Sequence, residues 1–330
     1  MKKAFTLIEL LMVIAIIGII STLAVNKVGA VRETAARKVS LANQVAVERA
    51  VESFLSGGGR LDRLDSLVTA QGADGQSAWR HAGRETDGGF DCTYTNFTAL
   101  SAELYLGPSR DFSGASSEAF RSEFNAGVTP ELGAVLCPYE LSAAQTDALA
   151  NRLGLRFVMA HNAYAGDPSA AYAGRRGADG AYVETRADGG RDPNESACLT
   201  VAVTNGMTLF AVNPVVERGR AIYRACGQNL LRTEENGTYD ETRAVADVNA
   251  TGGPLLALGL GERASIVGKA DAGLEAAPFA TYLPRTHYSR YILLIRLKRA
   301  GGTILPELAG VVDPCGLTVR DAREVVAGRD

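Results

Sequence analysis

The first 25 residues constrain this 330-residue chain more than any other segment. They begin Met1-Lys2-Lys3-Ala4 and continue as an apolar run from Phe5 to Val25, which a single acid, Glu9, interrupts. As a helix rising ~1.5 Å per residue, this run is roughly 31 Å long, which matches the hydrocarbon core of a bilayer. A carboxylate inside such a run costs about 2.5–3.5 kcal/mol on insertion scales. We therefore expect residues 5–25 to span a membrane and Glu9 to have a function.

The residues around Glu9 form a specific pattern. Phe-Thr-Leu-Ile-Glu-Leu-Leu over residues 5–11, followed by apolar residues to Ile20, closely resembles the class III signal of bacterial type IV pilins and type II secretion pseudopilins. The resemblance implies that a membrane-embedded prepilin peptidase cuts between Ala4 and Phe5, so that residues 1–4 are a leader peptide. It also implies that the same enzyme methylates the new amine of Phe5. Most members of this family have Gly where this chain has Ala4.

The resemblance also gives Glu9 a role in assembly. An unpaired carboxylate inside a bundle of apolar helices is costly, and a partner cation removes that cost. The family supplies one, the Phe5 amine of an adjacent subunit, so Glu9 would fix the register between subunits as a polar residue does in a coiled-coil seam. The alternative is a protonated Glu9 near the lipid headgroups of an ordinary anchor.

Two other interpretations of the N-terminal segment stay open. A secretory signal peptide also has a basic start, an apolar stretch and small residues at its cleavage site, here Thr22-Leu23-Ala24 or Val28-Gly29-Ala30. A simple one-pass anchor would place Lys2 and Lys3 in the cytoplasm and the bulk of the chain outside.

The helix is expected to continue past the membrane over residues 26–56. This stretch has no proline, and one stripe of apolar residues steps by three or four. Gly57-Gly58-Gly59 is expected to end the helix, because glycine tolerates the left-handed conformation of a C-cap. A helix from Phe5 to Ser56 would be roughly 75 Å long. A linker helix or a coiled-coil stalk is the alternative for residues 26–56. The predicted stripe comprises Val28, Val31, Ala35, Val39, Ala42, Ala46, Ala50 and Phe54.

Residues 57–330, called the head below, are predicted to be α+β, with antiparallel strands and few helices. The predicted architecture is a pilin-like lollipop, with the long N-terminal helix packed on an antiparallel, loop-rich head. Residues 160–196, biased towards Ala, Gly, Asp, Arg and Tyr, are expected to be a loop-rich insertion.

Local signals predict several elements of the head. Residues 61–68 are expected to form a short helix or turn, and residues 155–159 and 291–297 to form strands. Ser142 with Gln145 predicts a capped helix over 143–153. Asn205-Gly206 between two apolar, β-branched runs predicts a hairpin of strands 198–203 and 207–212. Residues 318–327 are expected to close the chain as a short helix.

The sequence contains no motif of a common enzyme class. Walker A, GxSxG and HExxH are absent, and none of the three histidines, His81, His161 and His287, lies beside a nucleophile motif. We therefore expect no enzyme activity. The formal net charge of −3 with no dense basic run argues against nucleic acid as a partner.

Cysteines and acids complete the candidate chemistry. Five cysteines without a CxxC argue against a zinc or redox motif. Proximity in sequence suggests disulfides Cys92–Cys137 and Cys198–Cys226, and five free buried cysteines are the alternative. No cofactor is predicted. The insertion also contains side chains that could offer hard oxygen ligands to calcium, but no ligand set is assigned. These side chains are Asp167, Asp179, Asp188, Asp192, Asn194 and Glu195.

These observations lead to a structural role. We predict that the protein is a pilin of a type IV filament or a pseudopilin of a type II secretion pseudopilus. A minor or specialised subunit is one form that this role can take. Its expected partners are the prepilin peptidase, other subunits, an inner-membrane assembly platform and lipid. The expected location is the inner membrane, with the head outside the cytoplasm, and then a periplasmic or extracellular filament. The alternative is an anchored or secreted extracytoplasmic binding protein or enzyme.

Overall fold

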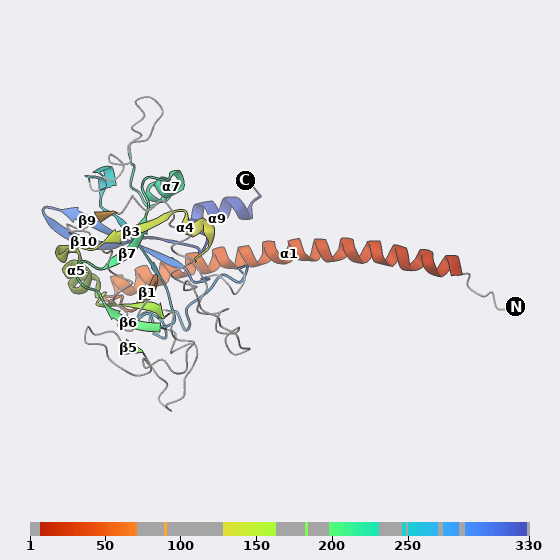
Figure 1. Cartoon of the computed structure of the whole chain (residues 1–330), viewed down its shortest axis with the longest axis horizontal. Coiled ribbons are helices and arrows are strands. Elements are labelled where there is room, and N and C mark those ends of the chain that lie inside the picture. The colour runs from red at the N-terminus through yellow and green to blue at the C-terminus, as the bar shows by residue number, and fades with distance from the viewer. Residues whose placement is uncertain are drawn as a thin grey trace, which may run out of the picture.

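The structure is a computed structural model, and it describes residues 7–70, 89–90, 128–162, 182–183, 198–230, 246–248, 250–269, 273–283 and 288–328. In the first helix, side chains are described from Val31 onward. Figure 1 shows that helix leading away from a sheet, with the C-terminal helix lying beside it.

Helix α1 (Leu7–Ser56) ends where the glycines predicted it would. Gly58 has a φ of 82°, and the Gly59 N–H donates to the Phe54 carbonyl at 2.8 Å. The Gly58 N–H donates to the Leu55 carbonyl at 3.0 Å. This pair of hydrogen bonds is a Schellman motif, which satisfies carbonyls of the last turn and turns the chain back toward the sheet.

The strands form one mixed sheet, in the order β2-β3-β7-β8-β1-β4-β6-β5, and β9 extends it by pairing with β8 and β10. Strand β8 is buried along its whole length and lies at the branch point. The strands are β1 (Leu64–Ala70), β2 (Gly89–Phe90), β3 (Leu136–Glu140), β4 (Phe157–Asn162), β5 (Tyr182–Val183), β6 (Cys198–Ala202), β7 (Thr208–Val212), β8 (Leu255–Gly259), β9 (Ile292–Ala300) and β10 (Thr303–Val312).

The helices of the head are short. They are α4 (Pro130–Gly133), α5 (Ala143–Ala148) with the π-helical turn η1 (Leu149–Leu153), α7 (Glu217–Ala225) and α9 (Val319–Val326). The predicted capping box of Ser142 and Gln145 is present at α5, and Gly154 ends η1 at a φ of 89°. The predicted C-terminal helix is α9, and Thr318 and Asp321 form its capping box.

An α+β class is therefore confirmed, but the sheet is not purely antiparallel. Strands β1 and β4 pair in parallel, from Leu64 beside Val158 to Ala70 beside Asn162. The prediction of a helix or turn over 61–68 is wrong, because β1 occupies most of that segment. Its leucines Leu64 and Leu67 are fully buried, and burial between neighbouring strands outweighs the weak local preference.

The predicted hairpin of β6 and β7 is also wrong, although both strands exist. Strand β6 pairs with β4 and β5, whereas β7 pairs with β3 and β8. The Asn205-Gly206 turn is present, and the Gly206 N–H donates to the Leu141 carbonyl at 2.9 Å. The turn therefore connects β6, which pairs with β4 and β5, to β7, which pairs with β3 and β8. In contrast, β9 and β10 form a true hairpin through a turn at Gly301 and Gly302.

One hydrophobic cluster joins the sheet to the C-terminal end of α1. It contains Val47 and Val51 of α1, all of β8 except its glycine, and the first four residues of β9. Helix α1 packs on β10 and α9. The predicted insertion over 160–196 lies mostly outside the described residues.

Candidate assembly site

The N-terminal signal contains the predicted processing and assembly residues, Ala4, Phe5 and Glu9. Glu9 belongs to the helix, but its side chain is outside the described part of the structure, as are Ala4 and Phe5. The second half of α1 is held by β10 and α9 of the head.

The inner face of α1 differs from the predicted stripe. Its buried residues are Ser40, Gln44, Val47 and Val51, which step by four, three and four along the helix. Ala50 and Phe54 of the predicted stripe pack partly against the core, but its other described members are exposed. The sequence pattern was misleading because two polar residues, Ser40 and Gln44, lie on the buried face.

Gln44 connects α1 to the C-terminal part of the chain. Its Nε2 donates to the carbonyl oxygen of Val311 at 2.9 Å and to that of Leu317 at 3.0 Å. The side chain is fully buried, so both hydrogen bonds form away from water. Its Oε1 has no partner among the described atoms. No local sequence signal marks this residue, because its partners lie 267 and 273 positions away.

Tyr291 makes a second buried polar connection to α1. Its hydroxyl donates to the Ser40 carbonyl at 2.8 Å and lies 2.9 Å from the Ser40 hydroxyl. Burial raises the pKa of Tyr291 to about 12, so the phenol keeps its proton at physiological pH. Gln44 and Tyr291 together fix the rotation of the helix against the sheet.

The loop after β10 is organised by Asp313. Its carboxylate accepts hydrogen bonds from the Tyr282 hydroxyl at 2.6 Å, from the Cys315 N–H at 3.0 Å and from the Leu317 N–H at 2.8 Å. Burial raises the pKa of Asp313, and these donors oppose that shift. Burial also raises the pKa of Tyr282, and the nearby Asp313 carboxylate raises it further. The guanidinium of Arg37 lies 5.0 Å from the Tyr282 ring centroid, which ties this loop to α1.

The outer face of α1 is apolar and exposed. Val31 is 70% exposed and Val39 is 51% exposed, and Ala35, Ala42 and Ala46 are exposed on the same side. Three large apolar side chains are exposed among the described residues, and two of them belong to this face. We call Val31, Ala35, Val39, Ala42 and Ala46 the outer stripe.

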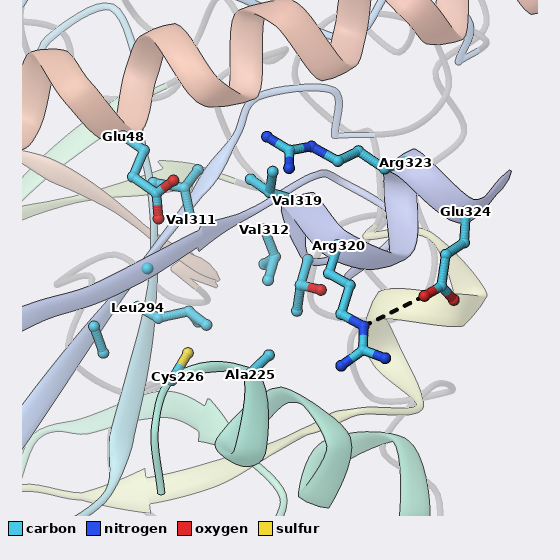
Figure 2. Close-up of a pocket in the computed structure, with 13 residues that line it drawn as sticks. Glu48, Ala225, Cys226, Leu294, Val311, Val312, Val319, Arg320, Arg323 and Glu324 are labelled. Carbon is cyan, nitrogen blue, oxygen red and sulfur yellow. Dashed lines mark hydrogen bonds and ion pairs between the residues drawn. The ribbon is translucent and has the colours of Figure 1, made fainter. Parts of the chain in front are cut away.

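A hollow of about 460 Å³ lies beside α1, between β10, the end of α7 and α9 (Figure 2). Leu294, Val311 and Val312 contribute apolar walls, and Glu48 of α1 faces Arg323 of α9 across it. Burial raises the pKa of the Glu48 carboxyl and Glu52 raises it further, whereas Arg323 lowers it. We call this hollow the α9 groove.

The described residues provide no metal centre. No group of three or more His, Cys, Asp or Glu side chains among them is arranged to hold an ion. The acids considered for calcium, Asp167 to Glu195, lie outside the described residues, as do His81 and His287. His161 lies in β4, and its side chain is not described.

The predicted disulfides are wrong. Cys137, which is buried in β3, forms no disulfide, and neither does Cys226 at the end of α7. Neither Cys92–Cys137 nor Cys198–Cys226 therefore forms. Proximity in sequence does not bring the second pair together, because Cys198 belongs to the β4–β6 pair whereas Cys226 lies at the end of α7. Cys315 forms no disulfide either.

Comparison with known proteins gives one match. No curated protein and no solved structure matches the chain. Among the described residues, no helix is both long and apolar enough to cross a membrane. Residues 1–25 match the family model described as the prokaryotic N-terminal methylation motif. The chain therefore carries the class III signal of prepilin-type proteins at its N-terminus.

Proposed function

We propose that this protein is a structural subunit, a pilin or a pseudopilin, of a type IV filament or of a type II secretion pseudopilus. Prepilin peptidase cuts between Ala4 and Phe5 and methylates the Phe5 amine, and the mature subunit assembles through α1. The observation that carries the proposal is the N-terminal methylation motif at residues 1–25. No enzyme activity is part of the proposal.

The mature N-terminus supplies the chemistry for assembly. After cleavage, the methylated amine of Phe5 still carries a positive charge at neutral pH. Paired with Glu9 of a neighbouring subunit, it would remove the cost of a carboxylate among apolar helices. The same carboxylate would reject a neighbour in the wrong register, because it would then remain unpaired.

The way α1 is held supports a role in which the helix carries load. Gln44 and Tyr291 bond it to β10, to the following loop and to the residue just before β9, so a pull on the helix is passed to the β9–β10 side of the sheet. The exposed outer stripe supports contact with further subunits, because exposed apolar surface of this kind marks interaction sites.

The proposed path of the protein follows from the signal. Before assembly, residues 5–25 anchor the subunit in the inner membrane with the head outside the cytoplasm. The assembly platform then adds it to a periplasmic or extracellular filament. Lipid, the platform and other subunits are its proposed partners.

Replacing Glu9 tests the proposal. Glu9→Ala should leave the protein in the membrane and nearly abolish its recovery in sheared filaments, because the carboxylate serves assembly and not insertion. Glu52→Ala is the matched control, because it removes an exposed carboxylate from the same helix. If Glu9→Ala enters the filament fraction like the wild type, the proposed function is wrong, and an anchored binding protein or enzyme becomes the working hypothesis.

A further inference from the structure

Two surfaces on the described part of the molecule, the outer stripe and the α9 groove, are complementary in shape and polarity. The outer stripe is a convex apolar strip, and the α9 groove is an apolar-walled hollow with charged groups at its rim. The packing of the head on α1 covers neither of these two surfaces.

Gly310 of β10 forms part of the floor of the α9 groove. A methyl group there would lie 3.5 Å from the Cys226 sulfur and 3.8 Å from Glu48 Oε1, so the hollow starts directly above the β10 backbone. Arg296 fixes the opposite wall, because its guanidinium donates to the Cys226 carbonyl and pairs with Glu307 at 3.1 Å. The hollow is therefore bounded by ordered elements of the head.

The charges at the rim are only partly paired. Arg320 pairs with Glu324 at 3.3 Å within α9 (Figure 2). In the described part of the chain, the Glu48 carboxylate has no ion-pair partner within 4 Å, and Arg323 is the cation that influences it. A partner that brings a cation to Glu48 and apolar groups to the walls would suit this groove.

The outer stripe offers that combination. Lys38 and Arg32, both exposed, flank it on the helix surface. A molecule cannot place the stripe in its own groove, because Val39 is nine residues from Glu48. At about 100° per residue, that spacing puts the two side chains on opposite faces of α1. The inner face of the helix is also fixed by Gln44 and Tyr291. Any contact between stripe and groove therefore joins two copies.

We propose that the α9 groove of one subunit receives the outer stripe of a neighbouring subunit, with Val39 over Gly310 and Lys38 beside Glu48. This inference rests on the proposed function, since it names the surfaces that meet in the assembled filament. The two surfaces are different and lie on opposite faces of α1, so the contact is heterologous and repeats from copy to copy. It forms an open polymer rather than a closed dimer, as a filament requires.

Cross-linking to the native thiol in the groove tests this directly. Full-length Val39→Cys subunits are assembled in their own cells, and the sheared filaments are treated with diamide, which oxidises two neighbouring thiols to a disulfide and is itself reduced to the hydrazine. The reaction is run at about pH 9, because burial raises the pKa of the Cys226 thiol to about 11. Peptide mass mapping should find Cys226 of one subunit bonded to the introduced thiol of another. Glu33→Cys, an exposed position on the opposite face of the same helix, is the matched control and should give no such bond.

Charge reversal provides a second measurement. Glu48→Lys or Lys38→Glu alone should lower recovery in sheared filaments about tenfold or more, because each puts like charges together. The double variant restores opposite charges and should return recovery to the wild-type level. This rescue separates a contact between subunits from a simple loss of folding.

The outcomes separate this inference from the proposed function. A bond between two introduced thiols would mean that stripes pack on each other, and would overturn the inference. Filaments without any bond to Cys226, or single reversals without effect, would overturn it as well, as would a double variant that stays defective. In each of these cases, loss of assembly in Glu9→Ala would leave the proposed function standing.

Discussion

Replacing Gln44 should loosen the connection between α1 and the head. In Gln44→Leu the side chain keeps a similar size, but the carbonyl oxygens of Val311 and Leu317 lose their donor at 2.9 and 3.0 Å. Each lost hydrogen bond costs about 0.5–1.5 kcal/mol, and a buried acceptor left without a partner costs about 1–3 kcal/mol. The unpartnered Oε1 of Gln44 disappears at the same time, which offsets part of the loss. We expect the free energy of unfolding to fall by about 2–4 kcal/mol.

The assay is urea unfolding of the full-length protein in detergent, followed by tyrosine fluorescence and circular dichroism. Arg49→Leu is the matched control, because it makes the same residue at an exposed position of the same helix. Its effect should stay within about 0.5 kcal/mol. If Gln44→Leu and Arg49→Leu changed the free energy of unfolding equally, the reasoning about this connection would be refuted.

Three further changes test other parts of the fold. Gly253→Ala should destabilise the protein strongly, because the new methyl would lie 2.0 Å from the Leu297 carbonyl oxygen at a φ of 91°. Tyr291→Phe should lower the free energy of unfolding by about 1 kcal/mol, through its lost hydrogen bond to Ser40 at 2.8 Å. Asp313→Asn should remove a pH dependence. The folded-state pKa of Asp313 is raised by burial, so the wild type loses stability as pH rises from the ordinary carboxyl range through that raised value, and the variant should not.

Each of these three predictions can be contradicted by a specific result. Gly57→Ala, whose methyl would meet its nearest atom at 3.4 Å, is the control for Gly253→Ala, and equal stability of the two would refute the close approach. Unchanged urea midpoints in Tyr291→Phe would show that its hydroxyl contributes nothing. Parallel stability curves of wild type and Asp313→Asn across acidic pH would show that burial does not shift this carboxyl.

Elements with local signals were predictable from the sequence. The capping boxes at Ser142 and Thr318 satisfy N–H groups within the same turn, so their effect does not depend on the rest of the fold. The same holds for the glycines that end α1, and for the Gly301-Gly302 turn between β9 and β10.

Features set by distant contacts were not predictable. Asn205-Gly206 does form a turn, but the partners of β6 and β7 are chosen elsewhere in the sheet. The buried face of α1 includes Ser40 and Gln44, since their hydrogen bonds to Tyr291, Val311 and Leu317 outweigh the polarity of the side chains. Most of the predicted apolar stripe of α1 therefore faces away from the head.

The candidate site also contains residues that a local sequence signal predicts and residues that only the fold brings together. Ala4, Phe5 and Glu9 belong to a linear signal, so their predicted roles follow from neighbours in the sequence, and the match over residues 1–25 supports the signal itself. The α9 groove is built from α1, α7, β9, β10 and α9. No stretch of sequence contains that arrangement, and only the folded structure brings Glu48, Cys226 and Gly310 together.

The N-terminal mass of the protein recovered from its native membrane and filament fractions tests the central proposal most directly. The account predicts a chain that begins at Phe5 and carries one additional methyl group on its amine. A chain that begins near Val25 or Val31 would show ordinary secretion, and a chain that keeps Met1 would show a plain anchor. Either of these results would contradict the account and remove the proposed role of Glu9 in assembly.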